Sequence, residues 1–216
     1  MKNVLNIEGK FAKYFVIFGV IIQLLTFFIT KDAVLSLVSG IAGVISVVQC
    51  AQRKLSFYFW GLLQIVTFMF IAAENNLYGK LIENAYYFIT MIIGIFIWST
   101  NSIDYKVIPK TLSKNAWYWI IIGIMVAFVV LYIILINTNC TVLFFDAMST
   151  SYGIFAQILM MLGYKEQWIL WLALDIFCII LFAIVGEWCM VAQYIFWTIN
   201  CIYGIINWKN YGTETY

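Results

Sequence analysis

Long apolar stretches separated by short polar segments make up most of this chain. Eight of them can be delimited, at residues 13–30, 33–50, 56–73, 81–98, 117–136, 145–162, 168–184 and 189–207. A helix needs ~20 predominantly apolar residues to cross ~30 Å of hydrocarbon. The pattern therefore predicts an all-α polytopic membrane protein with eight transmembrane helices.

The composition supports this prediction and excludes several classes of protein. Hydrophobic residues make up 65% of the chain and charged residues 10%, which cannot cover a water-soluble surface. There is no histidine, and the five cysteines show no CxxC pair, so the sequence predicts no metal site, no catalytic centre and no cofactor. The formal net charge of +2 marks orientation and predicts no nucleic-acid surface.

The basic residues predict the orientation in the membrane. When eight helices are threaded through a bilayer, Lys31 and Lys80 lie on one side, and the other ten of the 12 Lys and Arg residues lie opposite. These ten are Lys2, Lys10, Lys13, Arg53, Lys54, Lys106, Lys110, Lys114, Lys165 and Lys209. Basic residues in short loops favour the cytoplasm, so we expect both termini to be cytoplasmic.

An internal repeat is predicted at an offset of 110 residues. Segments 54–98 and 164–208 align without a gap, and the alignment extends upstream. The identical pairs include Ser39 with Ser149, Gly43 with Gly153, Leu62 with Leu172, Ala73 with Ala183, Ile89 with Ile199, Gly94 with Gly204 and Trp98 with Trp208. The alternative is two unrelated groups of helices of similar length.

The repeat predicts a domain plan of three, one and three helices. Residues 1–32 form a cytoplasmic N-terminus and an extra transmembrane helix, 33–98 the first repeat, 99–144 a cytoplasmic loop and linker helix, 145–208 the second repeat, and 209–216 a cytoplasmic tail. If two repeats of three helices were joined directly, the second would have the opposite orientation in the membrane to the first. The linker helix adds one more crossing and gives both repeats the same orientation. The repeats would then be parallel, with a site on their axis near mid-membrane.

Asp175 is the acidic residue that lies deep within a predicted helix. It follows Trp168 by seven residues, or about 10 Å along a helix. A carboxylate at that depth is costly in lipid, so Asp175 should face the interior of the bundle. Two interpretations remain open: a structural carboxylic acid bonded to a neighbouring helix, or the polar anchor of a binding cavity.

Other candidate binding residues follow from helical spacing. Trp168, Trp171 and Asp175 stand at i, i+3 and i+7 and should share one face, which suits a flat, polar, cationic ligand. A second face carries Gln193, Trp197 and Asn200, whose repeat partners are Glu83, Tyr87 and Thr90; Gln64 is an isolated amide in the third helix. The alternatives are an interfacial anchor for Trp168 and interhelical hydrogen bonds for the amides.

The segment from Tyr164 to Asp175 resembles the WxxWxxxN motif of the PnuC family of bacterial nicotinamide riboside transporters, with Asp175 where asparagine is common. The resemblance spans residues 33–208. It implies the three-one-three plan of the SWEET-like architecture, a bacterial inner-membrane location and transport without enzymatic activity. It also implies facilitated diffusion of an unphosphorylated vitamin or nucleoside, trapping by a cytoplasmic kinase, and a homotrimer.

The resemblance implies ligand-binding roles for Trp168, Trp171 and Asp175, and we add Gln64, Tyr87, Gln193, Trp197 and Asn200 to the candidate substrate site. An ionised Asp175 would favour the pyridinium of nicotinamide riboside or the thiazolium of thiamine. No Lys or Arg lies between the ends of the predicted helices, which argues against phosphorylated substrates. We therefore expect alternating-access uptake of nicotinamide riboside, with thiamine or a deoxynucleoside as alternatives.

Two functions of other classes are also compatible with a polytopic membrane protein. In a proton-coupled pump or a channel, Asp175 could be the titrating group. A membrane-embedded enzyme needs a nucleophile with a base or paired carboxylates, and the only further acidic candidate is Glu83, near the outer end of its helix.

Overall fold

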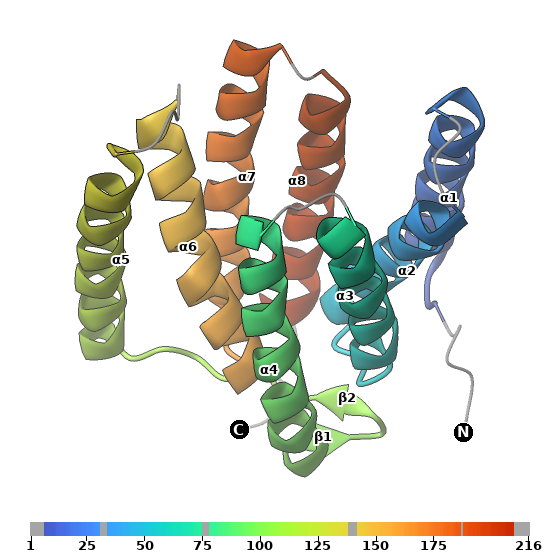
Figure 1. Cartoon of the computed structure of the whole chain (residues 1–216). Helices are drawn as coiled ribbons and strands as arrows, with labels where there is room; N and C mark the ends of the chain where they lie inside the picture. Colours follow the sequence, from blue (N-terminus) through green and yellow to red (C-terminus); the bar gives the residue numbers. More distant parts are fainter. Residues whose placement is uncertain (1–6, 31–33, 75–77, 138–141, 187, 210–216) are drawn as a thin grey trace. The chain divides into compact units, whose positions relative to one another are not determined.

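The computed structural model describes residues 7–30, 34–74, 78–137, 142–186 and 188–209, which form eight helices and one short hairpin (Figure 1). The helices are α1 (Lys10–Thr30), α2 (Val34–Ala51), α3 (Phe57–Glu74), α4 (Tyr78–Thr100), α5 (Lys114–Leu135), α6 (Leu143–Leu162), α7 (Gln167–Val185) and α8 (Trp188–Lys209). The strands β1 (Ser102–Ile103) and β2 (Lys106–Val107) pair in antiparallel fashion. Each predicted apolar stretch thus coincides with a helix.

Four of the helices are long and apolar enough to cross a membrane over 18 residues or more. They lie at Lys10–Ile29, Val34–Ala51, Lys114–Leu135 and Gln167–Ile184, and Phe57–Ile71 is a shorter apolar helix. Many large apolar side chains on these helices are exposed, among them Phe28, Val126 and Ile176. Exposed aliphatic faces of this kind suit contact with lipid chains rather than water.

The chain divides into two compact units, Met1–Ile108 and Pro109–Tyr216. In the first unit α1 packs on α2, α2 on α3, and α3 on α4. In the second unit α5 packs on α6, α6 on α7, and α7 on α8 (Figure 1). The single proline of the chain, Pro109, begins the second unit, and a proline disfavours helix both at its own position and at the residue before it.

The core of the second unit contains a cluster of buried apolar residues on α5, α6 and α7. The cluster consists of Ile124, Ala156, Leu159 and Leu170, and half-buried aromatic side chains, including those of Phe155 and Trp171, pack against it. Gly123 on α5 lies against the ring of Phe155, where a side chain would overlap that ring. A small residue at this position therefore lets α5 and α6 approach closely.

The two turns that follow α2 and α6 have the same hydrogen-bonded geometry. Arg53 and Gly163 are each left-handed, with φ of 61° and 78°. After α2, Arg53 N donates to Cys50 O (2.8 Å) and Lys54 N to Gln49 O (3.0 Å). After α6, the same two bonds recur 110 residues later, from Gly163 N to Met160 O (3.0 Å) and from Tyr164 N to Leu159 O (2.9 Å). Both turns are Schellman motifs, which satisfy the last carbonyls of a helix.

A backbone segment also braces each turn within its own unit. Lys54 forms an antiparallel bridge with Lys106 in the first unit, and Tyr164 forms a parallel bridge with Lys110 in the second. The sequence did not predict the β1–β2 hairpin. Its two turn residues, Asp104 and Tyr105, both have positive φ (49° and 61°), as in a type I′ turn, but Tyr105 replaces the glycine by which that turn is usually recognised.

Candidate functional site

Asp175 lies in the middle of α7 and is 2% exposed. The Sγ atom of Cys201 on α8 donates a hydrogen bond to its Oδ2 atom at 3.3 Å. The side chain therefore points toward α8 in the interior of the second unit, as its depth in an apolar helix predicts. A thiol is a weak donor, so this contact alone provides little stabilisation for a buried carboxylate.

Trp168 occupies the first turn of α7 and is 4% exposed. Its indole ring lies against Gly204 of α8 and meets the ring of Trp208 edge-on, with centroids 6.0 Å apart and planes at 72°. Its Nε1 atom has no hydrogen-bond partner among the described residues. The ring is thus held between two helices of the second unit.

Trp171 lies one turn further along α7 and is half-buried. It packs against the apolar cluster that contains Ile124 and Leu159. Trp168 and Asp175 instead contact α8. The three residues expected to share one face therefore have two sets of neighbours. At 100° per residue, Trp168 and Asp175 point in nearly the same direction from the helix axis, whereas Trp171 points to one side of them.

The predicted polar face of α8 lies in the same unit. Gln193 and Trp197 are half-buried, and Asn200 is 3% exposed. The ring of Trp197 packs edge-on against Tyr194, with centroids 5.0 Å apart. Asn200 directly precedes Cys201, the partner of Asp175. The sequence did not single out Cys201 for this role, since its spacing from the other cysteines carried no signal.

Two predicted site residues belong to the first unit. Gln64 on α3 is half-buried, and its side-chain amide lies against Gly43 of α2. Its backbone carbonyl accepts hydrogen bonds from Ser39 Oγ (3.2 Å) and Thr67 Oγ1 (2.9 Å). Tyr87 on α4 donates a hydrogen bond to Oε1 of Glu83 at 3.2 Å, one turn earlier on the same helix.

An aromatic side chain packs against a glycine in both units at the predicted offset. Tyr58 on α3 lies against Gly94 of α4, as Trp168 lies against Gly204. The ring of Tyr58 also meets Trp98 edge-on, with centroids 5.2 Å apart and planes at 83°. The sequence alignment paired Gly94 with Gly204, but it did not predict that aromatic side chains would cover them.

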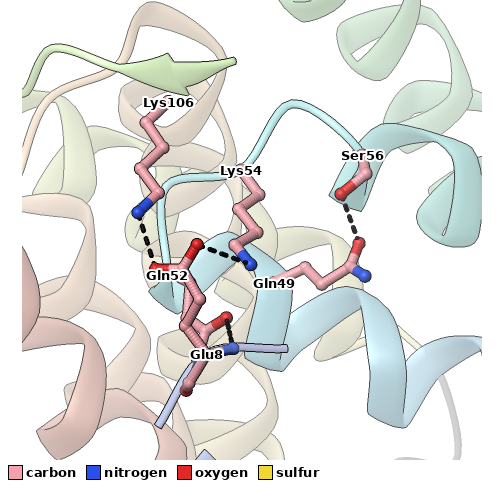
Figure 2. A network of polar contacts seen from close by, with 6 residues as sticks. All are labelled: Glu8, Gln49, Gln52, Lys54, Ser56 and Lys106. Atoms are coloured by element: carbon pink, nitrogen blue, oxygen red, sulfur yellow. Dashed lines mark hydrogen bonds and ion pairs between the residues drawn. The ribbon is translucent and has the colours of Figure 1, made fainter. Parts of the chain in front are cut away.

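A polar network that the sequence did not predict joins the start of the first unit to the turn after α2 (Figure 2). The side-chain amide of Gln52 pairs with the backbone of Glu8: Glu8 N donates to Oε1 of Gln52 (3.1 Å), and Nε2 of Gln52 donates to Glu8 O (2.6 Å). The Glu8 carboxylate forms ion pairs with Lys54 (3.2 Å) and Lys106 (2.7 Å). Residues from three separate segments thus meet at one carboxylate.

A neighbouring pair in this network holds the turn itself. The Oγ atom of Ser56 donates to Oε1 of the fully buried Gln49 at 2.8 Å (Figure 2). The Nη1 atom of the buried Arg53 donates to Val107 O at 3.2 Å. These contacts position the turn and the hairpin of the first unit, and they lie outside the predicted substrate site.

The chemistry available in the second unit is binding chemistry. Asp175 contributes a buried carboxylate, and the tryptophans contribute flat apolar rings. Among the described residues no group of three or more Cys, Asp or Glu side chains could hold a metal ion. A carboxylate near aromatic rings can bind a cationic or hydroxyl-rich ring compound.

Comparisons with known proteins agree with this interpretation. Residues 33–210 match the family described as nicotinamide mononucleotide transporter. The chain is similar to the nicotinamide riboside transporter PnuC of Haemophilus influenzae, with 31% identity over 88% of this chain and 85% of that protein. The protein of the same name from Neisseria mucosa is 26% identical over 87% of this chain and 76% of its own length. The one from Escherichia coli is 28% identical over 82% and 85%.

A solved structure supports the same assignment. The chain resembles the crystal structure of the vitamin B3 transporter PnuC, with a TM-score of 0.77, 25% identity and coverage of 94% of this chain and 92% of that one. That protein and the named relatives are transporters. The chain therefore belongs to the nicotinamide mononucleotide transporter family of membrane proteins, as the resemblance of its WxxWxxxD segment predicted.

Proposed function

We propose that this protein carries nicotinamide riboside across the bacterial cytoplasmic membrane by facilitated diffusion. The observation that carries the proposal is Asp175, a carboxylate buried in the middle of an apolar helix of a transporter-family chain. Nicotinamide riboside combines a pyridinium cation with ribose hydroxyls, and a carboxylate can attract the first and accept hydrogen bonds from the second.

The compound named in the family description and the compound named in the relatives' names differ by one phosphate group. The family is described by the mononucleotide, whereas the curated relatives are named for the riboside. A phosphate needs Lys or Arg to offset its charge in a membrane. The candidate residues of the second unit are acidic, aromatic or amide, and none is basic. This favours the riboside.

Trp168, Trp171 and Asp175 form the proposed substrate site of the second unit, together with Gln193, Trp197 and Asn200. Gln64 and Tyr87 are the proposed contribution of the first unit. The arrangement of three, one and three helices, with cytoplasmic termini, completes the proposal. The two Schellman turns and the two aromatic–glycine contacts, each related by an offset of 110 residues, support the repeat in this arrangement.

The proposed mechanism is alternating access, with two three-helix groups rocking about the site. A cytoplasmic kinase would phosphorylate the imported riboside, and the product would be retained because its phosphate finds no basic partner along the pathway. We propose a homotrimer as the assembly. Uptake into proteoliposomes separates this mechanism from a proton-coupled pump or channel. Facilitated diffusion predicts that the uptake rate does not change with a pH gradient. It also predicts that the electrical current equals the charge of the transported cations.

Binding is tested by tryptophan-fluorescence titration of the purified protein. The ligands are nicotinamide riboside, thiamine, riboflavin, a deoxynucleoside and nicotinamide mononucleotide. We expect saturable quenching by nicotinamide riboside, lost in Trp171→Ala and Asp175→Ala. The matched control is Trp119→Ala, which removes an exposed tryptophan of the same unit. Quenching by thiamine alone would change the substrate, and no response to any ligand would contradict the transport proposal.

A further inference from the structure

A groove opens between the first turn of α7 and the last turn of α8. Its volume is about 210 Å³, and it is lined by Lys165, Glu166, Ile169, Ile205 and Lys209. On this measure of volume one water molecule needs about 10–15 Å³, so the groove has room for more than a solvent molecule. Two lysines and a carboxylate thus lie at an otherwise apolar groove.

Glu166 provides an independent sign of a missing partner. It is 6% exposed, it directly precedes α7, and its Oε2 atom has no hydrogen-bond partner among the described residues. A buried carboxylate oxygen without a donor is costly, and nearly all such groups in proteins are satisfied. Glu166 also lines the groove, so an occupant that donates hydrogen bonds can approach its carboxylate.

Exposed isoleucines continue from the groove along both helices. They are Ile169, Ile176 and Ile180 on α7, and Ile199, Ile202 and Ile206 on α8. Within each helix these residues are three, four or seven positions apart, so each set forms one stripe. The stripes carry no polar side chain, in contrast to the helix faces that bear Asp175 and Asn200. They are suited to acyl chains lying alongside the helices.

We propose that this groove binds the headgroup of a phospholipid that carries a phosphate and a primary ammonium, as phosphatidylethanolamine does. The phosphate would lie between Lys165 and Lys209. The ammonium would donate hydrogen bonds to Glu166, and the acyl chains would follow the isoleucine stripes. An anionic lipid without an ammonium would fit the lysines but would place no compensating charge at Glu166.

The proposal predicts a preference within a lipid series that differs only at the ammonium. Delipidated full-length protein in detergent is examined by native mass spectrometry with phosphatidylethanolamine, its N-methylated and N,N-dimethylated forms, phosphatidylcholine and phosphatidylglycerol of the same acyl chains. We expect retained binding to weaken with each methyl group, because each removes one N–H donor. Equal binding of phosphatidylethanolamine and phosphatidylcholine, or binding of phosphatidylglycerol alone, would overturn the proposal.

Variants separate the roles of the three charged residues. A lysine near a lipid phosphate changes affinity about fivefold, so Lys165→Gln with Lys209→Gln should weaken phosphatidylethanolamine binding about 20-fold or more. Glu166→Gln should reduce the preference over phosphatidylcholine while retaining phosphate binding, because the amide oxygen still accepts hydrogen bonds but carries no charge. The matched control is Lys114→Gln, an exposed lysine of the same unit outside the groove. Binding unchanged in the double lysine variant would also contradict the proposal.

The lipid series on the wild-type protein needs no variant, so a folding defect in Glu166→Gln would leave the test intact. The outcome is also independent of the transported substrate. If the wild-type protein binds nicotinamide riboside but shows no lipid preference, only the lipid site is rejected. If it shows the lipid preference but does not bind nicotinamide riboside, only the proposed substrate is rejected.

Discussion

The indole ring of Trp168 lies directly against the backbone of Gly204, so that a Cβ atom at residue 204 would overlap the fused bond of the ring. Gly204 also lies one turn before Trp208, whose ring meets Trp168 edge-on. The glycine thus sets the distance between α7 and α8, and through it the position of Asp175 relative to Cys201.

Gly204→Ala should destabilise the protein because the indole is rigid and fully enclosed. Overpacking of this kind costs about 1–3 kcal/mol, to be measured as a loss of thermal or chemical stability in detergent. The cause is checked by a double-mutant cycle with Trp168→Leu, in which the double variant should lose less than the sum of the two single variants. Additive effects would mean that the ring does not limit the space at Gly204.

At residues 53 and 163 alike, glycine should be more stable than alanine. Both are left-handed, but residue 53 is an arginine and residue 163 a glycine. A non-glycine residue in this conformation costs about 1–2 kcal/mol. We therefore expect Gly163→Ala to destabilise by about 1 kcal/mol, and Arg53→Gly to be more stable than Arg53→Ala by a similar amount, since both variants lose the bond to Val107.

The control for this comparison is an exposed position inside a helix. Ile121 lies within α5 and is 53% exposed. There the order should reverse, with Ile121→Ala more stable than Ile121→Gly, because glycine is a poor helix former. If glycine were also the less stable choice at residue 53, the left-handed turn would be wrong.

The helices and the family could be predicted from the sequence because both depend on local patterns. Continuous apolar stretches predict helices wherever backbone groups must be satisfied in lipid, and the WxxWxxxD segment is a short, specific pattern. The depth of Asp175 along α7 predicted its burial in the same way. The cost of placing a carboxylate in lipid predicted that it faces the interior of the bundle, and the structure alone identifies α8 as the neighbour.

The contacts that the sequence did not predict depend on residues distant along the chain. Glu8 meets Lys106 across 98 positions, and nothing in either segment indicates the other. Cys201 reaches Asp175 because two helices pack closely, which depends on Gly204 and the ring that covers it. Trp171 was assigned to the face of Trp168 from spacing alone, whereas it packs against the apolar cluster on α5, α6 and α7.

The Glu8 network predicts a pH-dependent contribution to stability. Hydrogen bonding from Lys106 lowers the pKa of Glu8 below its ordinary value of 4.5, partial burial opposes this, and Lys54 adds to the lowering. A carboxylate with a lowered pKa in the folded state stabilises that state above the ordinary value, and the contribution is lost as the pH falls through the lowered one.

Glu8→Gln should therefore be less stable than the wild type at neutral pH and indistinguishable from it in acid. Because Glu8 is about half exposed, the difference should stay below about 1 kcal/mol. Thermal unfolding of both proteins between pH 7 and pH 3 measures it. The matched control, Asp104→Asn, changes an exposed carboxylate of the hairpin turn that is outside the Glu8 network. A difference that persists in acid would contradict the ion-pair explanation.

The charge of Asp175 should determine preference for a cationic substrate. The sharpest comparison uses nicotinamide riboside and its reduced, uncharged dihydro form, which share the sugar and the carboxamide. The pyridinium nitrogen carries the ribose and has no N–H, so the gain is a charge–charge attraction, worth about 4 kcal/mol for two unit charges ~4 Å apart at an effective dielectric constant of about 20. The wild-type protein should therefore bind the cation at least about tenfold more tightly, and Asp175→Asn should remove most of that preference, because an amide keeps the shape and loses the charge.

Cys201→Ala is the control that separates the charge of Asp175 from its position. It removes the thiol that donates to Oδ2 without altering the carboxylate. A thiol is a weak donor, so the preference for the cation should persist in Cys201→Ala and disappear in Asp175→Asn, as measured by fluorescence titration and by uptake into proteoliposomes. If Asp175→Asn kept the full preference, the cation would be recognised by the aromatic rings instead, and Asp175 would be a structural carboxylic acid between α7 and α8.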